Sequence, residues 1–219
     1  RERAGLNTGN ASLFLSNFYN TILEPESGYE WACMAEAQFK SRPYLINRAI
    51  LAQIWSLILL NQLSDAETLI DASRESILKS GDETQLAWLH FVNGMFDMEH
   101  GDYSSASNSI EQALRIYEQQ DWSYETQLNF LYHLAKIEVY ACDTRDIVSP
   151  SLAILEDKAL SEDLPGVLGQ VLLLKADIAL MEGDDSNARR ILQELRFLSK
   201  KENLLYMYPL IDRMFKKIS

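Results

Sequence analysis

The chain is short of cysteine, proline and glycine. Its 219 residues include 2 Cys, 5 Pro and 9 Gly. Cys33 and Cys142 lie 109 positions apart, and two such thiols do not form the crosslinked framework of a small secreted domain. We therefore expect reduced thiols in a cytoplasmic protein. The low proline and glycine content excludes collagen-like and low-complexity chains, and 47% hydrophobic residues predict a folded core.

Positive charge is also scarce. The chain has 20 Lys+Arg against 32 Asp+Glu, a formal net charge of −12, which repels nucleic acids and anionic membranes. No apolar run approaches the roughly 20 residues that span a bilayer. We expect no direct nucleic-acid binding and no membrane contact. Residues 187–219 differ, with 8 Lys+Arg, 3 Asp+Glu and a net charge of +5, which indicates either a solvated surface or a docking patch for an acidic neighbour.

The sequence has no arrangement of side chains that is typical of catalysis or metal binding. The three histidines, His90, His100 and His133, lack the spacing at which several ligands converge on one ion. Paired carboxylates such as Asp184-Asp185 fall where helices are expected to begin or end. No phosphate-binding glycine loop or nucleophile elbow is present. We therefore predict no catalytic residue, no metal, no cofactor and no enzymatic activity.

One short phrase of sequence occurs twice. Gly-Asp-x-Ser-x-Ala begins at Gly101 and again at Gly183, 82 residues later. Half of that interval is 41, and a step of this size back from Ala106 reaches Ala66, in another turn followed by a helical pattern. A fixed period of this length predicts a solenoid of stacked units. The predicted ranges, all in one solenoid domain, are an atypical helical hairpin over 1–44, repeats over 45–84, 85–125, 126–166 and 167–206, and a capping helix over 203–219.

Each repeat has the pattern of two helices around a short turn. In the second repeat, Ala106, Ile110, Ala113 and Tyr117 recur at the spacing of an apolar helix face. Gly101 favours the left-handed conformation that ends a helix, and the following aspartate can cap the next one. Strand patterns are nearly absent. The sequence therefore predicts an all-α fold.

Three further positions predict where helices begin. Ser64 and Asp82 each precede Glu or Gln by three residues, the spacing of a capping box. In the third repeat, Ser149 precedes Pro150, which favours a helix start with serine as the cap. We expect residues 143–148 to form the connection before that helix.

These residues resemble the tetratricopeptide repeat. Gly94, the turn Gly101-Asp102-Tyr103, Ala106 and Ala113 match the small residues and the turn of its signature, with weaker copies in the other repeats. The period exceeds the family's 34, so the chain looks more like the degenerate long-repeat type in regulatory arms of large bacterial signal-transduction ATPases. HEAT-like or other helical repeats stay open. The resemblance implies a right-handed α-α superhelix of about five hairpins and a capping helix, in which Gly94 faces Ala106.

The resemblance also implies a binding surface. In tetratricopeptide superhelices the first helix of each repeat forms the concave wall. Aromatic and methionine side chains on that wall would offer a large, adaptable contact area to a polypeptide, although the same residues could instead pack between repeats. Carried over by register, the candidate partner-binding residues are Trp55, Trp88, Phe91, Met95, Met98, Tyr132, Lys136 and Tyr140.

The leading functional hypothesis is a non-enzymatic interaction module, part of a larger protein, which binds a polypeptide segment in its concave groove. A second hypothesis is a sensory domain of a bacterial transcriptional or signalling regulator that binds a small inducer or peptide. A third is an accessory domain of an enzyme whose catalytic part lies elsewhere. The sequence leaves self-association of the module open.

Overall fold

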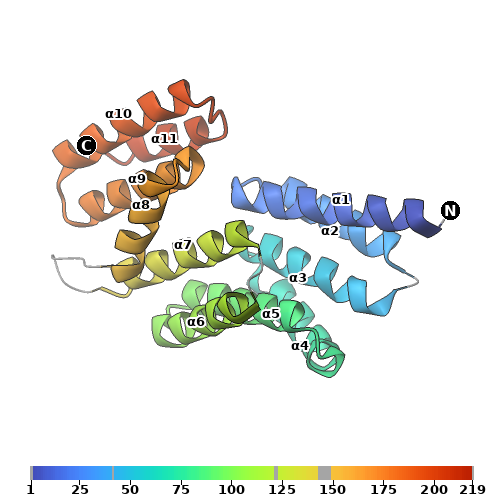
Figure 1. Cartoon of the computed structure of the whole chain (residues 1–219). Coiled ribbons are helices and arrows are strands. Elements are labelled where there is room, and N and C mark those ends of the chain that lie inside the picture. The colour runs from blue at the N-terminus through green and yellow to red at the C-terminus, as the bar shows by residue number, and fades with distance from the viewer. Residues whose placement is uncertain (1, 41, 121–122, 143–148, 219) are drawn as a thin grey trace. The chain divides into compact units, whose positions relative to one another are not determined.

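The computed structural model describes residues 2–40, 42–120, 123–142 and 149–218, and within these ranges the chain forms eleven helices and no strand. Contacts divide it into two compact units, Arg1–Ser123 (unit 1) and Tyr124–Ser219 (unit 2). Figure 1 shows the helices in chain order. They are α1 (Glu2–Thr21), α2 (Pro25–Gln38), α3 (Pro43–Leu59), α4 (Leu63–Ser80), α5 (Glu83–Glu99), α6 (Tyr103–Gln120), α7 (Tyr124–Tyr140), α8 (Pro150–Ser161), α9 (Pro165–Met181), α10 (Asp185–Lys201) and α11 (Met207–Phe215).

Unit 1 consists of three consecutive helix pairs, α1 with α2, α3 with α4 and α5 with α6. The first helices of the pairs also meet, because α3 contacts both α1 and α5. Small residues such as Ala32, Ala35 and Ala49 are completely buried beside Phe39. Because small side chains let helix axes approach each other closely, this composition brings α1, α2 and α3 together.

Helices α5 and α6 cross at close range. A Cβ atom on Gly94 would stand 2.9 Å from the backbone oxygen of Ala106 and 2.8 Å from Cγ1 of Ile110. These distances are shorter than van der Waals contact. The predicted pairing of Gly94 with Ala106 is confirmed, and it explains why both positions hold small residues.

In five of the turns that the structure describes completely, three residues separate the helices and the middle one adopts the left-handed conformation. Gly101 and Gly183 have φ of 77° and 76°. The aspartates that follow them cap the next helices. Asp102 accepts a hydrogen bond of 3.0 Å from the backbone N–H of Ser105, and Asp184 accepts one of 3.0 Å from the backbone N–H of Asn187. The two copies of the repeated phrase therefore have the same structure, as predicted. Where glycine is missing, the left-handed residues are Leu23 (φ 59°), Asn61 (φ 58°) and Asp163 (φ 54°).

Of the three helix caps predicted from the sequence, two are confirmed and one is wrong. The carboxylate of Asp82 accepts from the backbone N–H of Gln85 at 3.2 Å, which confirms that cap. The hydroxyl of Ser149 accepts from the backbone N–H of Leu152 at 3.0 Å, so this cap is confirmed too. The cap at Ser64 is wrong. Ser64 already lies inside α4, which begins at Leu63 after Gln62, and no side chain caps the helix.

Unit 2 consists of the pairs α7 with α8 and α9 with α10, followed by α11. Helix α9 contacts each of its neighbours, which agrees with its nearly continuous apolar sequence. Helix α11 buries Met207, Ile211 and Met214 in the core that it shares with α9 and α10. The capping helix is thus shorter than the predicted range. The predicted connection at 143–148 lies outside the described residues, and the division into four repeats in one solenoid stays a prediction.

None of the helices in the described ranges is long and apolar enough to cross a membrane.

Candidate functional site

The predicted aromatic residues of unit 1 form one cluster. Trp55 on α3 and Trp88 and Phe91 on α5 have ring centroids 5.2–5.6 Å apart, a separation that favours edge-to-face contact. Trp55 is 1% exposed and Phe91 is fully buried, whereas Trp88 is half-buried. The indole N–H of Trp88 donates to the hydroxyl of Tyr117 on α6 at 2.9 Å. The cluster therefore fixes the ring of Trp88 and leaves part of it at the surface.

The two predicted methionines of unit 1 lie deeper. Met95 is fully buried and Met98 is 6% exposed, both on α5. Their side chains, like those of Trp55 and Phe91, serve the core of unit 1, which was the alternative that the sequence left open. A direct contact with a partner stays a prediction for these four residues, and Trp88 is the member of the predicted set in unit 1 that offers exposed surface.

The three predicted residues of unit 2 share one face of α7. Tyr132, Lys136 and Tyr140 are all half-buried. The hydroxyl of Tyr140 donates to Oδ2 of Asp177 on α9 at 3.3 Å, and Lys217 donates to Oδ1 of the same carboxylate at 3.4 Å. The ammonium of Lys136 lies 5.7 Å from the centre of the Tyr140 ring. The structure thus brings the predicted trio together with Asp177 into one polar cluster, whose role in binding stays a prediction.

Burial changes the ionisation of two neighbours in this cluster. It raises the pKa of Tyr132 to about 12, and the carboxylate of Asp177 acts in the same direction. A phenol with its ordinary pKa of about 10 is already protonated at neutral pH, so the shift extends protonation of Tyr132 to more alkaline pH. Burial also lowers the pKa of His133 to about 3, with a smaller effect from Lys136. This imidazole is consequently neutral under physiological conditions.

A narrow cleft opens among the first helices of unit 1. It is lined by two residues of α1, three of α3 and three of α5, among them Asn17, Arg48, Thr84 and Trp88. Its enclosed space is about 20 Å³, which is room for about one group of the size of a water molecule. The cleft thus joins the exposed part of Trp88 to a small polar recess.

Sequence reasoning missed the polar residues of this cleft. Arg48 lies two helical turns before Trp55 on α3, and Thr84 lies one turn before Trp88 on α5. The signal was therefore available, because residues seven or four positions apart share a helix face. Arg48 and Thr84 are polar, so a pattern of aromatic residues along these faces does not include them.

A buried hydrogen-bond network holds the wall of the cleft. The side-chain amide of Gln85 donates to the backbone oxygen of Tyr44 at 2.7 Å and to Asp82 at 2.9 Å. Its oxygen accepts from Asn47 at 3.0 Å. Gln85 is fully buried, so these bonds replace those it would make with water. The network ties the start of α5 to α3 and fixes the relative positions of Arg48 and Thr84.

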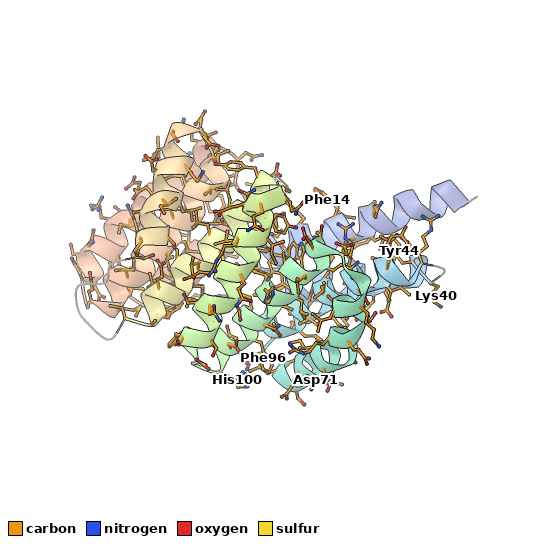
Figure 2. The ribbon with its side chains drawn as sticks, turned by 60° about the horizontal axis from the view of Figure 1, so that its bottom comes forward. Phe14, Lys40, Tyr44, Asp71, Phe96 and His100 are labelled. Atoms are coloured by element: carbon orange, nitrogen blue, oxygen red, sulfur yellow. The ribbon has the colours of Figure 1, made fainter. Side chains whose placement is uncertain are left out.

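The histidines occupy three separate places. His100 stacks on Phe96 near the end of α5 (Figure 2), with ring centroids 4.4 Å apart. His90 is half-buried on α5, where burial and Arg74 lower its pKa, and His133 lies in unit 2. In the described part of the chain, no group of three or more His, Cys, Asp or Glu side chains is placed to hold a metal ion.

Neither the protein-family models nor the curated sequences compared with the chain gave a match. Comparison with solved structures did give matches. The crystal structure of the apo form of RapI is 16% identical, with a TM-score of 0.58, over 96% of this chain and 81% of that one. The crystal structure of a Rap protein complexed with Competence and Sporulation Factor is 13% identical, with a TM-score of 0.61, over 96% of this chain and 63% of that one. The chain is therefore similar in fold to these Rap structures, and the predicted all-α, tetratricopeptide-like helical-repeat class is confirmed.

Proposed function

We propose that this chain is a non-enzymatic interaction module that binds a polypeptide segment along the first helices of its repeats. The observation that carries the proposal is the unit 1 cleft, where three first helices present the half-buried ring of Trp88 beside polar side chains. Aromatic rings held by packing give large contact area at a low entropic cost, which suits a peptide-binding surface.

Two further observations support this function. One of the fold neighbours was crystallised in complex with Competence and Sporulation Factor, so a similar fold binds a partner there. On α7 of unit 2, Tyr132, Lys136 and Tyr140 are half-buried on one face and supply a second aromatic and polar surface. The proposed partner-binding residue of unit 1 is Trp88, supported by the buried residues of the predicted set, and those of unit 2 are Tyr132, Lys136 and Tyr140.

The dimensions of the cleft favour a polypeptide over a small inducer. The space of about 20 Å³ in this partly open cleft is far below the roughly 300–1,000 Å³ of pockets that surround a small molecule. A peptide can instead lie across the surface and insert only a small group. We place the module in the cytoplasm, as a regulatory arm of a larger signalling protein of the kind that the long repeats resemble.

A peptide selection tests the proposal. A phage-displayed heptapeptide library is panned on the immobilised chain, and the enriched peptides are synthesised with a fluorescent label. Fluorescence anisotropy should show that Trp88→Ala weakens the binding of peptides held by unit 1, and Tyr140→Ala that of peptides held by unit 2, by about tenfold or more in each case, as expected for aromatic anchors. The matched control is Phe197→Ala, because Phe197 is 71% exposed on α10, the second helix of its pair.

The result that contradicts the proposal is a selection without enrichment, or enriched peptides that bind the two anchor variants and the wild type equally. Circular dichroism of each variant separates loss of binding from loss of fold. Phe197→Ala should bind like the wild type.

A further inference from the structure

The C-terminal part of the chain concentrates positive charge that the proposed function does not use. Residues 187–219 have a net charge of +5 in a chain of −12, so residues 1–186 carry −17. Helix α10 alone holds five of the 20 Lys and Arg residues, against two acidic ones. The sequence left two interpretations of this charge open, a solvated surface and a docking patch for an acidic neighbour. The side chains of α10 favour the second.

Helix α10 has an apolar side and a basic side. The apolar side is buried in the core that α10 shares with α9 and α11. On the opposite side, Arg189, Arg196 and Lys200 are exposed, and their spacing of seven and four positions places them on one face of the helix. At about 1.5 Å per residue, this row of cations is about 16 Å long. Together with Phe197 we call it the α10 face.

The cations of the α10 face are not neutralised within unit 2. None of the three forms an ion pair with a side chain in the described ranges. The acidic residues closest to them in sequence have other partners, because Glu194 pairs with Arg190 at 3.6 Å and Glu202 pairs with Lys201 at 2.7 Å. The face therefore presents a row of positive charge to solvent.

Phe197 adds an apolar contact to this row. Its side chain is 71% exposed and lies next to Arg196 in the sequence. Aromatic residues and arginine are the types enriched at protein–protein interfaces. A phenylalanine between cations gives a solvated surface no advantage, whereas a docking surface gains apolar area from it.

The charge and the dimensions of the α10 face favour an acidic helix as its partner. A helix packed alongside presents side chains at the same three- and four-residue spacing, so a row of carboxylates can meet the row of cations. One apolar residue beside that row can cover Phe197. A nucleic acid longer than the face would meet a chain whose residues 1–186 carry −17. A bilayer needs an apolar helix side, and α10 buries that side in the core.

We infer that the α10 face docks an acidic helix of a partner protein. Arg189, Arg196 and Lys200 are the ion-pair partners of its carboxylates, and Phe197 is the apolar contact. The inference is independent of the proposed function, which uses the first helices of the repeats. Heptapeptides do not report on it, because seven helical residues span about 10 Å, which is less than the length of the face.

Three synthetic helical peptides of equal length test the inference. Each has about 20 residues, mostly alanine, which is long enough to form a helix. The first carries glutamate at every third or fourth position along one face and a leucine beside that row. The second has glutamine in place of each glutamate. The third has the composition of the first, with its glutamates distributed around the helix.

Fluorescence anisotropy of labelled peptides measures their dissociation constants for the wild type, Arg196→Glu, Phe197→Ala and a control, Lys40→Glu. The control makes the same change of net charge as Arg196→Glu at an exposed residue of unit 1. Circular dichroism shows whether each variant is folded, which is expected because all three side chains are exposed.

The wild type and Lys40→Glu should bind the first peptide about tenfold more tightly than the other two peptides. Arg196→Glu should bind it about fivefold to tenfold more weakly, because an exposed ion pair is lost and a like-charge contact replaces it. Phe197→Ala should weaken binding severalfold through loss of apolar contact. Added NaCl should weaken binding by the wild type, as expected for exposed charges.

Equal binding of the three peptides by the wild type overturns the inference, and so does equal binding of the first peptide by the wild type and Arg196→Glu. A labelled oligothymidylate and vesicles of phosphatidylcholine with phosphatidylglycerol are tested in parallel. If either binds the wild type more tightly than the first peptide does and loses binding in Arg196→Glu, the face recognises phosphate groups, and the acidic helix is refuted as its partner.

Discussion

Replacing Gly94 by alanine should destabilise unit 1, although alanine is the better helix former. The added methyl group would stand 2.9 Å from the backbone oxygen of Ala106 and 2.8 Å from two side-chain atoms of Ile110. A side chain can rotate away, but the backbone oxygen moves only when α6 as a whole moves. The contact between the two helices must therefore widen.

The magnitude follows from two opposing effects. Overpacking of a tight core costs about 1–3 kcal/mol, and replacing glycine by alanine inside a helix contributes about 1 kcal/mol of stability. The cost of overpacking is the larger of the two effects, so we expect the free energy of unfolding of unit 1 to fall by about 1 kcal/mol. With a urea dependence of about 1–3 kcal/mol per molar, the unfolding midpoint should drop by roughly 0.3–1 M.

Tryptophan fluorescence is the appropriate assay because all four tryptophans of the sequence lie in residues 1–123. Urea unfolding followed by this signal reports on unit 1. A double-mutant cycle with Ile110→Val supplies the control, since a smaller partner should relieve part of the clash. A midpoint for Gly94→Ala equal to or above that of the wild type would refute the close-crossing explanation.

The remaining predictions concern unit 2. The pKa of His133 is lowered to about 3 in the folded state, so unfolding takes up a proton below the ordinary pKa of about 6.5. The stability that depends on neutral His133 is fully present above that pH and is lost as the pH falls; it should decrease by about 2 kcal/mol between pH 7 and pH 5. Urea unfolding followed by circular dichroism should show this slope, and an equal slope in His133→Gln would contradict the assignment. Glu138 accepts from the hydroxyls of Ser149 and Ser151 at 2.5 and 2.7 Å and from the backbone N–H of Ser151 at 3.0 Å. Glu138→Ala should therefore cost about 1–3 kcal/mol, and an unchanged melting curve would show that α8 does not depend on this carboxylate.

The turns show which parts of the fold local sequence determines. Gly101 and Asp102 could be assigned because glycine reaches the left-handed region without steric cost and aspartate caps the next helix. Leu23 takes the same conformation with φ 59°, but nothing in a leucine side chain favours it. The short distance between α1 and α2 imposes that conformation, so it could be known only from the structure.

The binding surface was predictable to a lesser degree. Periodicity identifies the first helices and their faces, but a residue such as Phe91 can face either a neighbouring helix or solvent at the same spacing. Packing decides between these, and it buries Phe91 and Met95 while leaving Trp88 at the edge. Arg48 was missed because a single exposed arginine is common in any sequence. Its place in the cleft beside Trp88 depends on how α3 packs against α5, and only the structure gives that packing.

The short turns restrict how this molecule could change in length over evolution. Each residue of an α-helix advances the chain by 100° around the axis, so one deletion at Asn61 or Gly183 would rotate the following helix and carry its apolar side toward water. A turn of three residues is too short to compensate for that rotation. Descendants of such a chain are expected to diverge by exchanging side chains at constant turn length. A similar fold at 13–16% identity shows that many different side chains can satisfy it.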